Sequence, residues 1–149
     1  LGNLTSQFFA NVYLNELDQF VKHILKVKYY IRYVDDFVIL HSSKDHLEEL
    51  KSKINDFLKD RLQLQLHPEK SKIIPLSKGI DFVGFRNFYY YKLLRKRNII
   101  NMKRKIALCN EGKISNKKFL EIVQGWHAYV RWGNSYNLVK KLINTVKMR

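Results

Sequence analysis

Apolar and polar residues follow two different patterns along this chain, and the pattern changes near residue 94. Before that point, segments with apolar residues three or four positions apart, which predict helices, are interleaved with short apolar runs that favour strands. After it, only the helical spacing continues. We therefore expect an α+β region over residues 1–94 and a small all-α region over residues 95–149.

The helical spacing defines the expected helices. The first covers residues 8–25 and follows Leu1–Gln7, a segment rich in small polar residues that we expect to form a loop. A second covers Ser43–Asp60, where Ser43 or Asp45 can cap the first free N–H groups. Glycine-containing breaks separate the helices expected at Asn98–Cys109, Ser115–Trp132 and Ser135–Lys147.

The strand-like runs predict hairpins. Residues 29–41 contain two β-branched and aromatic runs around a polar pair, which is the pattern of a tight antiparallel hairpin. Leucine alternates with glutamine over residues 62–66, as in a half-buried strand. Gly79–Tyr91 predicts a second hairpin, whose aromatic side chains we interpret as packing residues, with base stacking as the alternative. Together these elements predict an antiparallel sheet with helices on one face.

Composition narrows the class of protein. The chain has 149 residues, of which 46% are hydrophobic and 28% charged, so we expect one globular domain or two small ones. Its single cysteine, Cys109, excludes an internal disulfide and indicates a reducing compartment such as the cytoplasm. No apolar run is long enough to predict a membrane span.

The net charge of +15 is concentrated at one end. Residues 1–94 carry +3, whereas residues 95–149 carry +12. A helical region this basic predicts a polyanionic partner, most simply nucleic acid. The alternative is a generally basic protein whose lysines are only solvated.

The polar pair in the first predicted hairpin is the candidate for chemistry. Asp35 and Asp36 are expected at the hairpin tip, where two carboxylates could bind Mg²⁺ through oxygen ligands. The alternative is a solvated turn, because aspartate is a common turn residue. The helix start near Thr5 and Ser6 could receive a phosphate, or these residues could simply cap the helix.

The tetrapeptide Tyr33-Val34-Asp35-Asp36 matches the YxDD box of reverse transcriptases. A tetrapeptide alone is weak support, but further segments resemble the same family in the right order. They are Gly2-Asn3-Leu4-Thr5-Ser6-Gln7 before a helix, LQLHPEKSKI with its Lys70, the hairpin Phe82-Val83-Gly84-Phe85, and the basic helical end. The chain therefore resembles the reverse transcriptases over nearly its whole length.

The resemblance implies the palm and thumb of an RNA-directed DNA polymerase that copies RNA into cDNA. The palm, a partial ferredoxin-like antiparallel sheet with helices on one face, would occupy residues 1–94 and the thumb residues 95–149. The family's chemistry is nucleotidyl transfer with a pair of Mg²⁺ ions, for which Mn²⁺ can substitute. The implied partners are an RNA template, a DNA primer, dNTPs and a basic accessory protein.

The resemblance also assigns roles to individual residues. Asp35 and Asp36 would be the catalytic metal ligands. Tyr33 would shape the floor of the site, and Lys70 would protonate the leaving group. Contacts with template or nucleotide are assigned to Gly2, Asn3, Ser6 and Gln7. The primer grip is assigned to Phe82, Val83, Gly84 and Phe85. Contacts with the duplex backbone are assigned to Arg95, Lys96, Arg97, Lys103, Arg104 and Lys105.

Residues around the upstream motif suggest a subclass. Many family members have Gln before the glycine and Pro after the serine, whereas this chain has Leu1 before Gly2 and Gln7 after Ser6. That departure resembles the prokaryotic reverse transcriptases of diversity-generating retroelements, with group II intron and retron enzymes as alternatives. The resemblance implies a protein of the cytoplasm of a prokaryotic cell. A nucleic-acid-binding module that kept the palm shape and lost its chemistry, or a structural accessory protein, is the non-enzyme interpretation.

A further catalytic aspartate is expected in this family on a strand upstream of the Gly2 motif. The sequence begins at Leu1, within that motif, and contains neither this aspartate nor the fingers. We therefore interpret the sequence as a fragment and expect it to be inactive, or nearly so, by itself.

Overall fold

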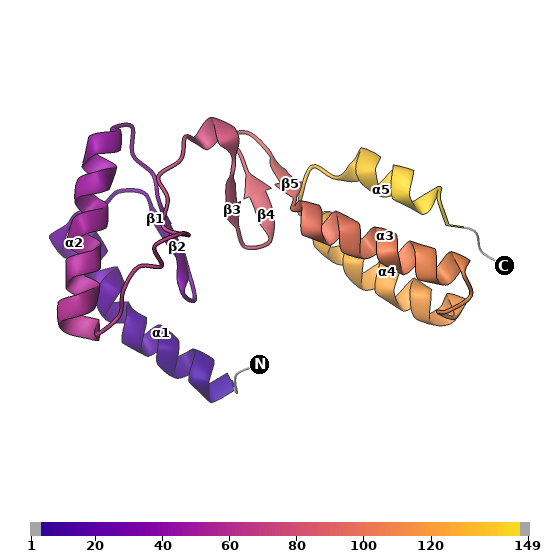
Figure 1. The fold of residues 1–149 in the computed structure, drawn as a ribbon, viewed down its shortest axis with the longest axis horizontal. Helices are drawn as coiled ribbons and strands as arrows, with labels where there is room; N and C mark the ends of the chain where they lie inside the picture. Colours follow the sequence, from indigo (N-terminus) through magenta and orange to yellow (C-terminus); the bar gives the residue numbers. More distant parts are fainter. Residues whose placement is uncertain (1–3, 147–149) are drawn as a thin grey trace. The chain divides into compact units, whose positions relative to one another are not determined.

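The computed structural model describes residues 4–146 and has an α+β architecture, as the sequence predicted (Figure 1). The chain divides into two compact units, residues 1–74 and residues 75–149, called here the N-terminal and C-terminal units. No helix in the described part is long and apolar enough to cross a membrane. The expected division into a palm (residues 1–94) and a thumb (residues 95–149) assigns functional roles to the two regions, and these roles stay a prediction.

The N-terminal unit packs two long helices against a hairpin (Figure 1). Helix α1 (Leu4–Gln19) continues into a π-helical turn, η1 (Phe20–Ile24), and precedes strands β1 (Tyr30–Tyr33) and β2 (Asp36–Ile39). Helix α2 (Lys44–Leu62) follows. The buried core of this unit consists of Leu17, Val21, Ile54, Leu58 and Leu62.

Local sequence signals explain most of these boundaries. Strands β1 and β2 pair antiparallel, which confirms the first predicted hairpin. Helix α2 confirms the second predicted helix, and its N-cap is Ser43, whose hydroxyl accepts a hydrogen bond from the His46 N–H at 3.2 Å. Apolar residues four positions apart place Leu50, Ile54 and Leu58 on the buried face of α2.

Three expectations for the N-terminal unit were wrong. Helix α1 already begins at Leu4, so the second half of the predicted loop is helical. The predicted strand over residues 62–66 is absent, because Leu62 is buried as the last residue of α2 and Gln63 ends the helix in a left-handed conformation, with φ at 51°. Asp36 is the first residue of β2, so only Asp35 of the pair lies in the turn.

The C-terminal unit combines a small sheet with three helices. A 3₁₀ turn, η2 (Leu76–Lys78), leads into strands β3 (Ile80–Phe82), β4 (Phe85–Asn87) and β5 (Lys92–Leu94). These form an antiparallel meander in the order β3-β4-β5, so the predicted second hairpin has a third strand. The three predicted helices are confirmed as α3 (Lys96–Asn110), α4 (Asn116–Val130) and α5 (Tyr136–Ile143).

Two clusters of buried side chains hold the C-terminal unit together. One joins the helices and contains Met102, Ile106, Cys109, Phe119 and Leu142. The other joins the meander to the helices and contains Phe85, Leu94, Val130 and Val139. The sheet is therefore fixed to the helical bundle by a shared apolar core.

The described residues form two separate small sheets instead of one sheet. The strand expected between the two hairpins is missing, because its leucine-rich segment completes helix α2 and then continues without strand structure. The α+β class was thus predicted correctly, whereas a single ferredoxin-like sheet is not present in residues 4–146.

Candidate active site

The turn that carries Asp35 is tight and strained. Tyr33 pairs with Asp36, so Val34 and Asp35 alone connect β1 to β2. Val34 has φ at 56°, a conformation that a β-branched residue adopts only at a cost. Two-residue hairpin loops with a positive φ at the first position usually have glycine there. The backbone beside Asp35 therefore needs support from surrounding groups.

The two carboxylates suit a hard cation but do not form a complete site. Asp35 and Asp36 are both exposed, and neither takes part in the ion pairs within residues 4–146. Carboxylate oxygens are the ligands that Mg²⁺ takes, often only one or two of them from the protein. No group of three potential side-chain ligands occurs in the described part of the chain. Tyr33, with 59% of its surface exposed, precedes the turn.

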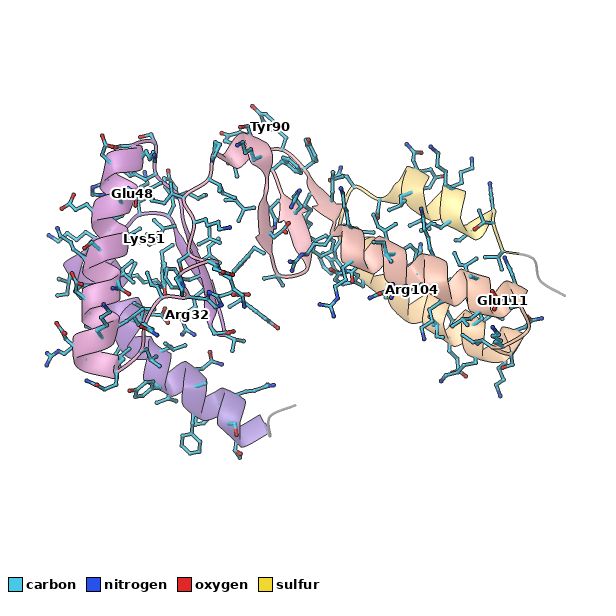
Figure 2. All side chains as sticks on the ribbon, viewed as in Figure 1. Arg32, Glu48, Lys51, Tyr90, Arg104 and Glu111 are labelled. Atoms are coloured by element: carbon cyan, nitrogen blue, oxygen red, sulfur yellow. The ribbon has the colours of Figure 1, made fainter. Side chains whose placement is uncertain are left out.

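A charged cluster connects α1 to this turn. The Arg32 guanidinium donates to the Asp18 carboxylate from Nε to Oδ1 at 2.8 Å and from Nη2 to Oδ2 at 2.6 Å. Its Nη1 donates to Asn11 Oδ1 at 3.1 Å and to the Val34 carbonyl at 2.7 Å. The Tyr30 hydroxyl donates to Asp18 Oδ1 at 2.7 Å. Figure 2 labels Arg32, whose side chain lies between the hairpin and α1.

The charges in this cluster reinforce one another. The hydrogen bonds from Arg32 hold the pKa of Asp18 below its ordinary value despite partial burial. The same ion pair raises the pKa of Arg32. Burial, followed by the hydrogen bond to Asp18, raises the pKa of Tyr30. Arg32 and Asp18 therefore stay charged and Tyr30 stays protonated at neutral pH.

We expect Asp18→Asn to lower the free energy of unfolding by about 2 kcal/mol at pH 7, because the partly buried Arg32 loses its counter-charge. Since the folded-state pKa of Asp18 is lowered, the wild type has this stabilisation above about pH 4 and loses it as the pH falls through that lowered value. The difference between the two proteins should shrink between about pH 5 and pH 2.

Urea unfolding followed by circular dichroism at several pH values measures this difference. Asp60→Asn, at an exposed position of α2, is the matched control and should unfold like the wild type. A difference for Asp18→Asn that stays constant or grows in acid would contradict the pairing with Arg32.

The β3–β4 turn, which corresponds to the expected primer grip, is also strained and also supported by a distant side chain. Val83 and Gly84 have φ at 47° and 80°. The Tyr129 hydroxyl, from α4, donates to the Gly84 carbonyl at 2.8 Å and accepts from Asn98 Nδ2 at 3.1 Å. Phe85 is buried and stacks on the Tyr129 ring with centroids 4.8 Å apart. The turn is therefore tied to helices α3 and α4.

The other predicted site residues lie in different parts of the structure. Ser6 and Gln7 are exposed in the first turns of α1, and Lys70 is exposed in the turn after α2. Gly2 and Asn3 lie outside the described residues. Phe82 is half-buried, whereas Val83 is 47% exposed at the tip of its turn.

The predicted duplex-contacting residues are all exposed at the start of α3 or along it, and Figure 2 labels one of them, Arg104. They are Arg95, Lys96, Arg97, Lys103, Arg104 and Lys105. Arg95 also approaches Asp81, with Nη2 and Oδ2 3.6 Å apart. Arg95, Lys96 and Arg97 lie at the N-terminal end of α3, where cations are unfavourable with respect to the helix dipole, so these three side chains do not stabilise the helix itself.

Comparison with known proteins decides the family. The model of the family described as "Reverse transcriptase (RNA-dependent DNA polymerase)" matches residues 1–87, more than half of this chain. The chain belongs to the reverse transcriptase family. The match includes both aspartates of the β1–β2 turn region, Lys70 and the β3–β4 hairpin.

Three relatives show how much of a reverse transcriptase-like protein this chain covers. Protein YkfC of Escherichia coli (strain K12) is 32% identical over 88 residues, which are 58% of this chain and 22% of that protein. Group II intron-encoded protein LtrA of Lactococcus lactis subsp. cremoris is 34% identical over 61 residues, 40% of this chain and 10% of that protein.

The third relative is the putative COX1/OXI3 intron 2 protein of Saccharomyces cerevisiae (strain ATCC 204508 / S288c). It is 33% identical over 61 residues, 40% of this chain and 7% of that protein. The reverse transcriptase chain described here thus spans at most 22% of the length of these relatives.

Sequence reasoning missed the residues that support the two turns of this reverse transcriptase. Arg32 is the one charged residue within the apolar run of β1. This unusual position is the only feature of the sequence that marks Arg32 as a residue with a structural role. Asp18 lies near the end of α1 between Leu17 and Gln19, where nothing in the pattern distinguishes it from the exposed polar residues of a helix. Tyr129 has no sequence signal, because it falls on the apolar face of its helix and such a pattern does not show what the hydroxyl binds.

Proposed function

We propose that the protein is an RNA-directed DNA polymerase that extends a primer along an RNA template by nucleotidyl transfer. The observation that carries this proposal is the Tyr33–Asp36 motif, placed on a tight antiparallel hairpin with both carboxylates exposed, within a chain that matches the reverse transcriptase family. A binding module would have no use for two carboxylates beside a polyanionic ligand.

In this proposal Asp35 and Asp36 hold the metal. When bound, Mg²⁺ supplies activation of the primer 3′-hydroxyl and stabilisation of the leaving pyrophosphate. Tyr33 lies before the turn and shapes the floor beneath the primer end. Lys70, exposed in the turn after α2, would give a proton to the leaving group. Ser6 would contact the template or the incoming nucleotide from the first turns of α1.

The C-terminal unit would hold the primer–template duplex. Val83 at the exposed tip of the β3–β4 turn would contact the primer, while the buried Phe85 would hold the hairpin in place. The exposed cations on α3, beginning at Arg95, would contact phosphates without reading the sequence. Cations and the helix dipole both favour an anion at the start of α3.

The test is primer extension by the full-length protein on an RNA template, with Mg²⁺, with Mn²⁺ and after chelation. The proposal expects extension that requires the metal and the RNA template. Duplex binding without extension under any of these conditions would favour the binding module instead.

Binding of an RNA–DNA duplex is expected to weaken steeply with salt. If about six cations of α3 contact phosphates, affinity should fall roughly 1,000-fold between 50 and 200 mM salt. Fluorescence anisotropy of a labelled duplex measures this effect. Replacing Lys103, Arg104 and Lys105 together with glutamine should weaken binding and flatten the salt dependence. Affinity that does not change with salt would contradict the role of α3.

The subclass of the enzyme is a finer proposal. The residues beside the upstream motif favour a diversity-generating retroelement, whereas the name of the LtrA relative supports the group II intron-type alternative. The error spectrum of the extension products separates the two. Errors concentrated at template adenines support the former, and evenly distributed errors support the latter.

A further inference from the structure

We propose that Arg32 is a positioning residue for catalysis. Its hydrogen bond to the Val34 carbonyl would hold the strained turn and so fix the orientation of the Asp35 side chain. The proposal rests on the proposed polymerase function and names a residue that acts through another one. Arg32 itself lies within β1, opposite Phe37, and is not part of the YxDD motif.

The bond to Val34 determines the orientation of the next residue. The peptide between Val34 and Asp35 is planar, so the carbonyl oxygen of Val34 and the N–H of Asp35 move as one rigid group. Arg32 Nη1 donates to that oxygen at 2.7 Å. Holding the oxygen therefore holds the plane from which the Asp35 side chain extends.

The guanidinium is itself immobilised. Its side chain is only 11% exposed, and Asp18 accepts bonds from two of its nitrogens at 2.8 and 2.6 Å. A third nitrogen reaches both Asn11 and the turn. Asp18 and Asn11 belong to α1, which packs into the core. Arg32 therefore ties the turn to this helix as well as to the strands of the hairpin.

The turn needs such support because its backbone is unfavourable. Val34 has φ at 56°, which costs energy for a β-branched residue. Without an external bond, the turn can relax towards an unstrained conformation that rotates the peptide and displaces Asp35. A small misplacement of a catalytic group is enough to lower the rate strongly.

The test uses Arg32→Gln, Arg32→Lys and Tyr30→Phe in the full-length protein. We expect both Arg32 variants to lower kcat about 10-fold or more, because neither side chain reproduces the planar guanidinium that bonds both Asp18 oxygens and the Val34 carbonyl from three nitrogens at once. The KM for dNTP and the Kd for duplex should change by less than about threefold. Tyr30→Phe removes a bond to the same Asp18 without reaching the turn, so it should lower Tm and leave kcat unchanged.

A second substitution separates positioning from general stability. In the Val34→Gly background the positive φ costs nothing, so the turn no longer depends on Arg32. Arg32→Gln should then lower kcat by less than about threefold. Any loss of fold stability would persist in that background. The Arg32→Lys variant, which keeps the positive charge beside Asp18, provides the comparison if Arg32→Gln does not fold.

The outcomes are distinct. A wild type that extends primers, together with Arg32 variants of normal kcat, overturns the positioning role and leaves the polymerase function intact. The positioning role is also overturned if Tyr30→Phe lowers kcat as much as Arg32→Gln does. It is overturned as well if Arg32→Gln lowers kcat as much in the Val34→Gly background as in the wild type. A wild type without RNA-templated extension overturns the polymerase function and this proposal together.

Discussion

Asp35→Asn is expected to reduce RNA-templated primer extension by the full-length protein about 1,000-fold or more. The substitution removes one negative charge from the exposed pair that would hold Mg²⁺, while asparagine keeps the size of the side chain. Metal ions supply several kcal/mol of transition-state stabilisation, and each 1.4 kcal/mol corresponds to a factor of about ten in rate. Single-nucleotide incorporation, measured at saturating dNTP, gives the loss directly.

The fold should survive this substitution, because Asp35 lies in an exposed turn and forms none of the ion pairs within residues 4–146. Duplex affinity should therefore change little. Asp60→Asn, which removes an exposed carboxylate of α2, should extend primers like the wild type. If Asp35→Asn kept normal incorporation, the hairpin would be an ordinary acidic turn and the proposed function would fail.

Gly84→Ala is expected to lower the free energy of unfolding of the C-terminal unit by about 2 to 3 kcal/mol. Gly84 has φ at 80°, where an alanine side chain costs about 1–2 kcal/mol. Its Cβ would also overlap the Tyr129 hydroxyl. If the Tyr129 ring moves away, its hydroxyl loses the hydrogen bond to the Gly84 carbonyl, which contributes about 1 kcal/mol.

Gly112→Ala is the matched control for this effect. Gly112 has φ at 73°, but a Cβ there would have no neighbour within 4 Å, so only the conformational cost of about 1–2 kcal/mol remains. Both tryptophans, Trp126 and Trp132, belong to the C-terminal unit, so tryptophan fluorescence in urea reports on this unit. Equal losses for the two variants would show that Tyr129 does not clamp the turn.

Local patterns were enough to predict much of the fold. The hairpin around Asp35 and the three helices after residue 95 were predicted correctly, because strand and helix periodicities are properties of neighbouring residues. The family was also predicted from the order of its motifs and is confirmed by the match to residues 1–87. The roles of Asp35, Lys70 and the other site residues stay predictions.

Other boundaries depended on packing. Leu62 satisfies the alternating pattern of a strand equally well, but it joins Leu58 and Ile54 in the core and so extends helix α2. Because Leu62 belongs to the helix, the strand expected over residues 62–66, which would have joined the two hairpins into one sheet, does not form. A short apolar run is ambiguous between helix and strand until its burial is known.

What the sequence by itself determined is therefore the order of the helices and the two hairpins, the hairpin that carries Asp35, and the family. Only the tertiary structure decided how the two strained turns are held. Arg32 reaches Asp18 across 14 positions in sequence, and Tyr129 reaches Gly84 across 45. Hydrogen bonds between residues so far apart leave no periodic signal, because they depend on which surfaces the packed core brings together.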